Sequence, residues 1–261
     1  MSVWDMYEDR INASGKTNRE RLLNQTKDNI SRKIKDSLSY HYVSIDGVSQ
    51  GITITDDSND LSIKKICALP DEGLLHGGMV EYANSHWIIT EVDANDEVYS
   101  KGKMQRCNYL LKWLDDTGSI IEKWSIVEDG TKYLIGEKSS DMMSIGDARI
   151  AITLPKDADT NKLCRGMRFL VDDNDADRVL AYQITKPNKL YNIYDGRGIF
   201  RFILNEVNLT DDDNVKLRIA DYYNWKKPEE ELSHKDQDIT LSEIIDRSDN
   251  NYDKTSEGRW I

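Results

Sequence analysis

The strongest constraint on the fold is a run of short segments with β-strand composition between His76 and Lys132. The segments combine β-branched and aromatic residues, and turn residues such as Asp129-Gly130 stand between them. Short segments separated in this way are typical of antiparallel β-structure and not of helices. The strands predicted in this part of the chain are 78–83, 86–92, 97–100, 104–114 and 120–127.

The longest of these segments, 104–114, alternates between two faces, as successive residues of a strand must. One face is predicted to lie in the core of a β-barrel and comprises Cys107, Tyr109, Leu111 and Trp113. The opposite face is more polar, and we expect it to stay partly in contact with water.

The first 39 residues have a helical pattern. A short helix is predicted over residues 3–13 and ends near Ser14-Gly15, and a second helix begins at Thr17 or Asn18 and reaches about Ser37. Gly15-Lys16-Thr17 lacks the earlier glycine and the preceding strand of a phosphate-binding loop, so it is interpreted as a turn between helices. The apolar residues of the second helix recur at spacings near four and are Leu22, Leu23, Ile30, Ile34 and Leu38. They form a narrow stripe on a helix whose segment 19–36 holds six basic and three acidic residues.

The period changes from helical to alternating at Tyr40. Two β-rich runs flank Asp46-Gly47, which is a strong signal for a hairpin with a two-residue turn. A further apolar run, 63–69, is closed by Pro70. These patterns predict that the β-structure begins at the end of the second helix.

The polar stretch 136–146 is the predicted boundary between two β-domains. Beyond it, strands are predicted over 147–154, 167–171, 178–185 and 199–207. From Lys226 onward, ten acidic and six basic residues with few large apolar ones have the composition of a disordered extension. The prediction is a mainly β protein with a helical arm over 1–39, a β-barrel-like domain over 40–136, a second antiparallel barrel or sandwich-like domain over 137–225, and an acidic tail over 226–261.

Composition limits the possible partners. The chain has 35 basic and 47 acidic residues, a net charge of −12, which is unsuited to gripping nucleic acid through its phosphates. No apolar run approaches the roughly 20 residues that a membrane-spanning helix needs. The three widely spaced cysteines favour a reducing compartment without a disulfide framework, so we expect synthesis in the cytoplasm.

No catalytic or cofactor-binding constellation emerges from the spacing of the residues, and we expect neither an enzyme nor a cofactor nor a resident metal. His76, His86 and Cys107 could meet as zinc ligands only if neighbouring strands brought them together. The acidic runs 172–177 and 211–214 superficially resemble calcium loops. The first lacks the glycine and the closing glutamate of an EF-hand, and both runs are interpreted as hairpin loops, with a loose surface cation site left open.

Several strings together resemble proteins encoded in the structural-gene modules of tailed phages and prophages of Gram-positive bacteria. They are Val3-Trp-Asp-Met-Tyr-Glu8, Leu38-Ser-Tyr-His41, His76-Gly-Gly78, Trp87, Glu97-Val-Tyr99, Cys107-Asn-Tyr-Leu-Leu-Lys-Trp113, Glu128-Asp-Gly-Thr-Lys-Tyr133, Ala181-Tyr-Gln183, Lys186-Pro187 and Ile219-Ala-Asp-Tyr-Tyr223. Within such modules, the central pattern is similar to the small β-barrel of head-closure, or stopper, proteins of the virion neck. A minimal stopper is about half the length of this chain.

The resemblance implies a structural protein of the virion neck, made in the host cytoplasm, that forms a homo-oligomeric ring. Its expected partners are its own copies, the portal-side or adaptor-side protein, the tail-side protein, and genomic DNA that passes through the lumen without specific binding; no membrane contact is expected. Rings arise from head-to-tail contacts between identical subunits, so the predicted function lies in interfaces. The interface candidates are Trp4, Tyr7, Arg19, Arg32, Lys33, Asp172, Asp173, Asp175 and Trp260.

Two other interpretations remain open. One is a tail or baseplate protein whose β-domain contacts other tail proteins or carbohydrate, which would require exposed aromatic residues such as Trp87 or Trp124. The other is a soluble hydrolase with a carboxylate pair in a deep pocket.

Overall fold

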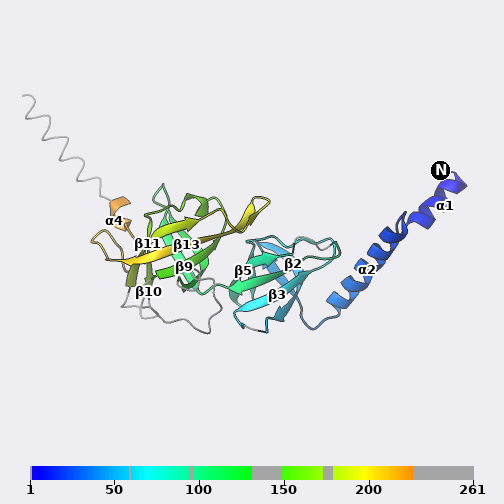
Figure 1. The fold of residues 1–261 in the computed structure, drawn as a ribbon, viewed down its shortest axis with the longest axis horizontal. Helices are drawn as coiled ribbons and strands as arrows, with labels where there is room; N and C mark the ends of the chain where they lie inside the picture. Colours follow the sequence, from blue (N-terminus) through cyan, green and yellow to red (C-terminus); the bar gives the residue numbers. More distant parts are fainter. Residues whose placement is uncertain (1, 59, 94–96, 131–148, 173–178, 226–261) are drawn as a thin grey trace, which may run out of the picture.

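The computed structural model describes residues 2–58, 60–93, 97–130, 149–172 and 179–225. The chain is mainly β, with two barrel-like antiparallel sheets and an N-terminal helical arm, which confirms the predicted fold class. Figure 1 shows the arm and the second sheet at opposite ends of the molecule, with the first barrel between them. The predicted acidic tail lies outside the described residues.

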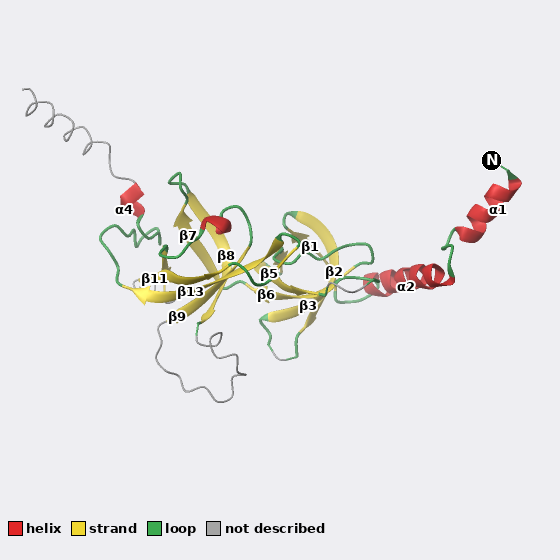
Figure 2. Ribbon diagram, turned by 45° about the horizontal axis from the view of Figure 1, so that its top comes forward, coloured by secondary structure: helices red, strands yellow, loops and turns green. Residues whose placement is uncertain are grey.

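The arm consists of α1 (Val3–Asn12) and α2 (Asn18–Lys35), close to the predicted limits. No residue of α2 is fully buried, and the helix does not lie across a core. Figure 2 shows the two helices as consecutive rods that leave the body of the protein at the barrel. Of its apolar stripe, Leu22 and Leu38 are exposed, whereas the other three residues, Leu23, Ile30 and Ile34, are half-buried.

The first sheet closes into a six-stranded barrel in the order β1-β2-β3-β6-β5-β4, with β4 pairing back to β1. Its strands are β1 (Tyr40–Ile45), β2 (Val48–Asp56), β3 (Ile63–Ala68), β4 (Met79–Tyr82), β5 (Ser85–Val92) and β6 (Lys101–Arg106). Alternate residues face inward, so the barrel is filled by side chains such as Ile52, Ile89 and Met104. Closure leaves no open sheet edge in this unit.

The second sheet runs in the order β10-β11-β13-β9-β8-β7, with β12 attached to β13. Its strands are β7 (Tyr109–Leu114), β8 (Ile120–Asp129), β9 (Arg149–Pro155), β10 (Arg168–Asp172), β11 (Val179–Asn188), β12 (Ile193–Tyr194) and β13 (Arg197–Val207). The sheet curls until its ends approach: the Tyr109 hydroxyl of β7 accepts a hydrogen bond from the Asp172 amide (3.3 Å) and donates one to the Leu170 carbonyl of β10 (3.4 Å). Burial raises the pKa of Tyr109 to about 12, so this phenol stays protonated. Short helices η1 (Thr160–Lys162) and α4 (Tyr222–Trp225) complete the unit.

The division between the two units differs from the predicted one. The stretch 136–146 lies outside the described residues, but β7 pairs with β8 and β8 pairs with β9, and neither belongs to the barrel. The boundary therefore falls between β6 and β7. The polar stretch 136–146 was interpreted as the linker between the two domains. The chain in fact passes from one sheet to the other over only two residues, Cys107 and Asn108, which have no such polar composition.

The predicted strand 104–114 is in fact two strands, and the predicted strand 97–100 precedes β6 without being part of it. Tyr109, Leu111 and Trp113 do share one face, but they pack into the core of the second unit, not into the barrel. Cys107 lies in the two-residue link and is buried between the units. The alternation was predicted correctly, while the break at Cys107-Asn108 was missed because the alternation of Cys107 with the residues of β7 continues across it without a gap.

Two-residue turns with positive φ fix three hairpins. Asp46-Gly47 joins β1 to β2 as predicted, Ala83-Asn84 joins β4 to β5, and Asp195-Gly196 joins β12 to β13. Positive φ at both central residues gives the turn a twist that matches the strands. The Asp46 side chain also accepts a hydrogen bond from the Met79 amide (2.8 Å) and forms an ion pair with Arg197 of the second unit (3.2 Å).

The two units pack on each other through what we call the junction cluster. It comprises the buried residues Ile88, Cys107, Ile126 and Ile199, with Met79 and Trp124 packed against them. Beside it the backbones of Gly77 and Gly198 touch: a Cβ on Gly77 would lie 2.0 Å from the Gly198 carbonyl oxygen. Since Gly77 also has φ of +80°, both its conformation and its surroundings require glycine.

Substitution Gly77→Ala should lower the free energy of unfolding by about 1–3 kcal/mol, because it combines left-handed strain with a backbone clash at the junction. Chemical denaturation followed by tryptophan fluorescence measures the change. Gly73→Ala is the matched control, since nothing lies within 4 Å of a Cβ there and its φ is not positive. Equal stability of the two variants would show that the glycine contact does not hold the units together.

Candidate interaction surfaces

The helix α1 presents large apolar side chains to solvent. Trp4 is 74% exposed and Tyr7 is 56% exposed, and their rings meet edge to face at 6.1 Å. Both were predicted as interface candidates, and the structure places them side by side on the outermost helix. The exposed apolar residues of α1 also include Val3, Met6 and Ile11, which the sequence interpretation did not single out.

The turn between the two helices is built by side-chain capping. The Thr17 hydroxyl accepts a hydrogen bond from the Glu20 amide (3.2 Å), and the Glu20 carboxylate accepts one from the Thr17 amide (3.2 Å) and one from the Lys16 amide (2.7 Å). These bonds, that of Thr17 first, lower the pKa of Glu20. The reciprocal pair is a capping box that starts α2 at a defined residue. The interpretation of Gly15-Lys16-Thr17 as a helix-linking turn is therefore confirmed.

Exposed ion pairs connect α2 to loops of its own barrel. Arg19 bonds both carboxylate oxygens of Glu97 (2.7 and 2.9 Å), and Lys27 bonds Asp71 at 2.6 Å. Exposed pairs of this kind contribute about 0–1 kcal/mol each, so they orient the arm more than they stabilise it. Arg19 was predicted to contact another subunit, and here it binds within the chain.

The other basic candidates, Arg32 and Lys33, lie in the last turn of α2, at its C-terminal end. Arg32 donates to the Asn29 side chain (2.8 Å), and both Arg32 and Lys33 are exposed in the last turn of the helix. Arg19 lies near the opposite end of α2, so the predicted basic residues form two separate patches. Cations at a helix C-terminus are favourably placed against its dipole, which gives Arg32 and Lys33 a local role as well.

The acidic candidates of the second unit are only partly described. The Asp172 side chain is 14% exposed and pairs with Arg218 at 2.6 Å, so it is engaged within the chain. Asp173, Asp175 and Trp260 lie outside the described residues. The predicted acidic interface patch is therefore represented in the structure by Asp172 alone.

Run 211–214, weighed as a calcium loop, serves an internal ion pair. The fully buried Asp213 carboxylate receives both guanidinium nitrogens of Arg168 (2.8 and 3.0 Å) and the amides of Thr210 and Asp221. Burial raises the pKa of Asp213, but these bonds outweigh it, and the pKa lies below its usual value. Arg168 also binds the Asp221 side chain at 2.9 Å. The network holds segment 208–221 on β10, which sequence spacing could not indicate because its members are about 40–50 residues apart.

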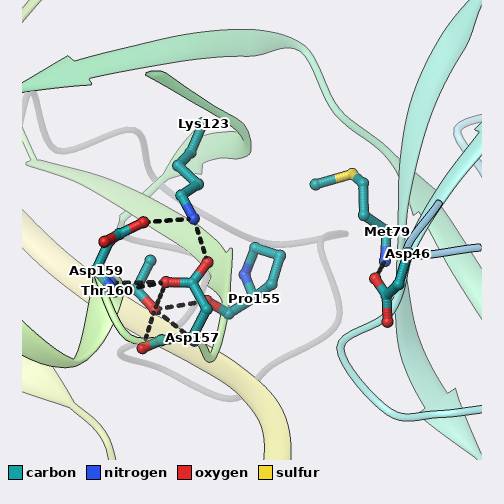
Figure 3. Close-up of polar contacts among 7 residues, drawn as sticks. All are labelled: Asp46, Met79, Lys123, Pro155, Asp157, Asp159 and Thr160. Atoms are coloured by element: carbon teal, nitrogen blue, oxygen red, sulfur yellow. Dashed lines mark hydrogen bonds and ion pairs between the residues drawn. The ribbon is translucent and has the colours of Figure 1, made fainter. Parts of the chain in front are cut away.

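Two cavities of about 550 Å³ each lie at the junction between the units. Both have His86 and Trp124 in their walls, and these rings stack at 4.7 Å with an interplanar angle of 22°. The second cavity also has the wall residues Lys123 and Asp157, shown in Figure 3.

In that wall the Asp157 carboxylate binds Lys123 and accepts from the amides of Asp159 and Thr160, and Asp159 also pairs with Lys123 at 2.9 Å. Burial raises the pKa of Asp157, but Lys123 and the Thr160 amide outweigh it and lower the pKa. Lys123, Asp157 and Asp159 therefore all bind one another, and together they hold the loop after β9 against β8.

His76, His86 and Cys107, which were weighed as zinc ligands, do not share one site. Cys107 and His86 share the first cavity, and His86 and His76 share the second. Within the described parts of the chain, no group of three or more His, Cys, Asp or Glu residues could hold a metal ion. Burial raises the pKa of Cys107 to about 12, so its thiol remains protonated and is a poor ligand or nucleophile.

His76 is instead a neutral residue of the junction. Its ring meets Tyr194 of the β12–β13 hairpin at 5.1 Å, and its Nδ1 atom is buried without a hydrogen-bond partner among the described residues. Burial lowers the pKa of His76 below 6.5, against smaller opposing effects of the Thr90 backbone and Glu91. Protonation would place an uncompensated charge between the two units.

Stability should therefore fall on mild acidification. The unfolded chain binds a proton at His76 near pH 6.5 and the folded chain does so only at lower pH, so the contribution is complete above pH 6.5 and is lost as the pH falls through the folded pKa. In chemical denaturation at a series of pH values below 6.5, His76→Gln should flatten the dependence of the unfolding free energy on pH. Identical pH profiles for wild type and His76→Gln would contradict this role.

Residues 7–106 match the family model of the YomX N-terminal domain. YomX is a Bacillus phage-region protein, so over these residues the chain is similar to a phage protein. The match covers α2 and the entire barrel and ends at Arg106, the last residue of β6. Family similarity and strand pairing thus place a boundary at the same point. No curated protein and no solved structure matches the chain. In the described residues no helix is long and apolar enough to cross a membrane.

Proposed function

We propose that this chain is a structural protein of the phage virion neck, which closes the DNA-filled head and joins it to the tail through ring-forming subunit contacts. The observation that carries the proposal is the helical arm, in which α2 has no buried residue and α1 exposes five large apolar side chains. An arm that contributes so little to its own fold is suited to bind a neighbouring subunit. The similarity to a phage-region protein extends into this arm, since it begins at residue 7.

The body of the protein suits a ring subunit. The barrel and the second sheet are joined by two residues, the junction cluster and the Gly77–Gly198 contact, so their relative orientation is fixed by packing. A ring closes only if every subunit presents its two contact surfaces at the same angle. A rigid body with a reaching arm satisfies both requirements.

Charge supports passage of DNA without adhesion. The chain has a net charge of −12, whereas segment 19–36 of the arm has six basic and three acidic residues. In the proposed ring the acidic surplus faces the lumen and repels DNA within a Debye length of roughly 8–10 Å. The basic end of α2, with Arg32 and Lys33, faces an acidic surface of a portal-side or tail-side partner. The proposal assigns no catalytic reaction, cofactor or metal to the chain.

The alternative is a tail or baseplate protein that contacts other tail proteins or carbohydrate. Carbohydrate binding would use open aromatic faces, but Trp87 is 4% exposed and donates its indole N–H to the Tyr82 carbonyl, and Trp124 stacks on His86. Exposed tyrosines such as Tyr42 and Tyr191 keep a tail contact open. The neck is favoured because the arm accounts for subunit contacts more directly than these scattered tyrosines do.

Location in the particle tests the proposal. Gold-labelled antibody against the chain should mark the head–tail junction of virions. A phage without the chain should accumulate heads that carry no tails and that leak their DNA after it has been packaged. Complementation by wild type and by Leu190→Ala, an exposed apolar control on the second unit, should restore joined particles. Label at the distal tail would favour the alternative, and absence of the chain from virions would overturn both.

A further inference from the structure

The apolar residues of α1 lie on one side of the helix. Val3, Tyr7 and Ile11 follow each other at spacings of four, and Trp4 and Met6 border them. All five side chains are between 46% and 82% exposed. A surface helix normally buries such a face, but in the part of the chain that the structure describes this one stays open to solvent.

The position and length of α1 indicate that the partner is a separate molecule. A helix of 10 residues is only marginally stable by itself in water. Figures 1 and 2 both show α1 at the end of the arm, away from the barrel. The intervening α2 has 18 residues and is about 27 Å long, which is enough to carry α1 to an adjacent subunit.

A groove on the barrel has complementary properties. It has a volume of about 380 Å³ and crosses β3, β6 and the end of β5, where a bulge lies next to Gly102. The half-buried Cys67 and Val92 form its apolar part, whereas the Ile66 side chain belongs to the barrel core. A groove of this size accommodates a large aromatic side chain.

Charge favours α1 as the occupant. The barrel segment 40–106 has 11 acidic and five basic residues, and three of those five, Lys65, Lys101 and Lys103, line this groove, where they outnumber its two acids, Glu91 and Asp93. Lys65 and Lys103 pair with acids of the barrel, yet their side chains remain 49% and 39% exposed. The sequence of α1 contains three acidic residues and one arginine. A helix with this charge is repelled by most of the barrel and attracted to the groove.

We propose that α1 of one copy docks by its Trp4–Tyr7 face in the lysine-flanked groove of a second copy, between β3, β5 and β6. The contact is head to tail, because arm and groove are different surfaces of the same chain, and repetition of it produces a ring or a filament. The inference rests on the proposed neck role for its biological meaning, but the contact itself is a property of the purified chain.

Disulfide trapping tests the contact, because Cys67 lies in the groove. A donor copy carries Trp4→Cys, Cys67→Ser and Cys164→Ser, and a tagged acceptor copy carries only Cys164→Ser, which removes the exposed cysteine. Mild oxidation of the mixture should give a donor–acceptor dimer that disappears when the acceptor also carries Cys67→Ser. A donor with Leu190→Cys in place of Trp4→Cys is the matched control and should give none, since Leu190 is 87% exposed on the second unit.

Sedimentation of the full chain supplies an independent measurement. Trp4→Ala with Tyr7→Ala should raise the apparent Kd of self-association at least about tenfold, whereas Leu190→Ala should leave it unchanged. Equal association of the double variant, donor–donor dimers in place of donor–acceptor dimers, or trapping within a single copy that carries both cysteines would overturn the proposal. The proposal would also be overturned if the wild-type chain did not self-associate and bound lipid vesicles instead. If these tests fail, the proposed neck location is still decided by antibody labelling. If the label lies elsewhere in the virion, the proposed arm contact is still decided by the trapping and sedimentation results.

Discussion

The packing of the barrel against the second sheet is the interaction on which the rest of the structure depends. Cys107 and Asn108 are the only residues between β6 and β7, so the chain changes sheets without a linker that could absorb an error in orientation. Asn108 continues the strand pairing from its side chain, which exchanges hydrogen bonds of 2.7 Å with both backbone groups of Val127. The junction cluster and the Gly77–Gly198 contact then lock the angle. The two units therefore pack directly on each other without a linker between them.

The arm follows the opposite principle. Its helices are specified locally, by the capping box at Thr17 and Glu20, and are attached to the barrel by exposed ion pairs of low energy. Its large apolar side chains contribute little to the stability of the isolated chain. In the proposed ring, rigid bodies set the geometry and arms supply the contacts, so the function requires no reactive group.

Local patterns predicted much of the fold. The helix limits, the Asp46-Gly47 hairpin and most strands could be predicted because capping, turn chemistry and alternation act over a few residues. The unit boundary was misplaced because strand pairing is non-local: nothing in residues 109–129 shows that they pair with β9 and not with β6. Trp4 and Tyr7 could be proposed as interface residues because they are large aromatic residues in a short N-terminal helix. The Arg168–Asp213 pair and the lysine-flanked groove form only when distant strands come together.

The central claim is that the two packed units bind their neighbours through an arm whose outer helix, α1, leaves its apolar face exposed in the described part of the chain. Hydrogen exchange of the full chain, compared between dilute and assembled protein, tests it most directly. Amides of α1 and α2 should exchange rapidly in the dilute monomer and become protected on assembly, while amides of the barrel and of the second sheet remain equally protected in both. Strong protection of the arm in the dilute monomer, or assembly that leaves its exchange unchanged, would contradict the account.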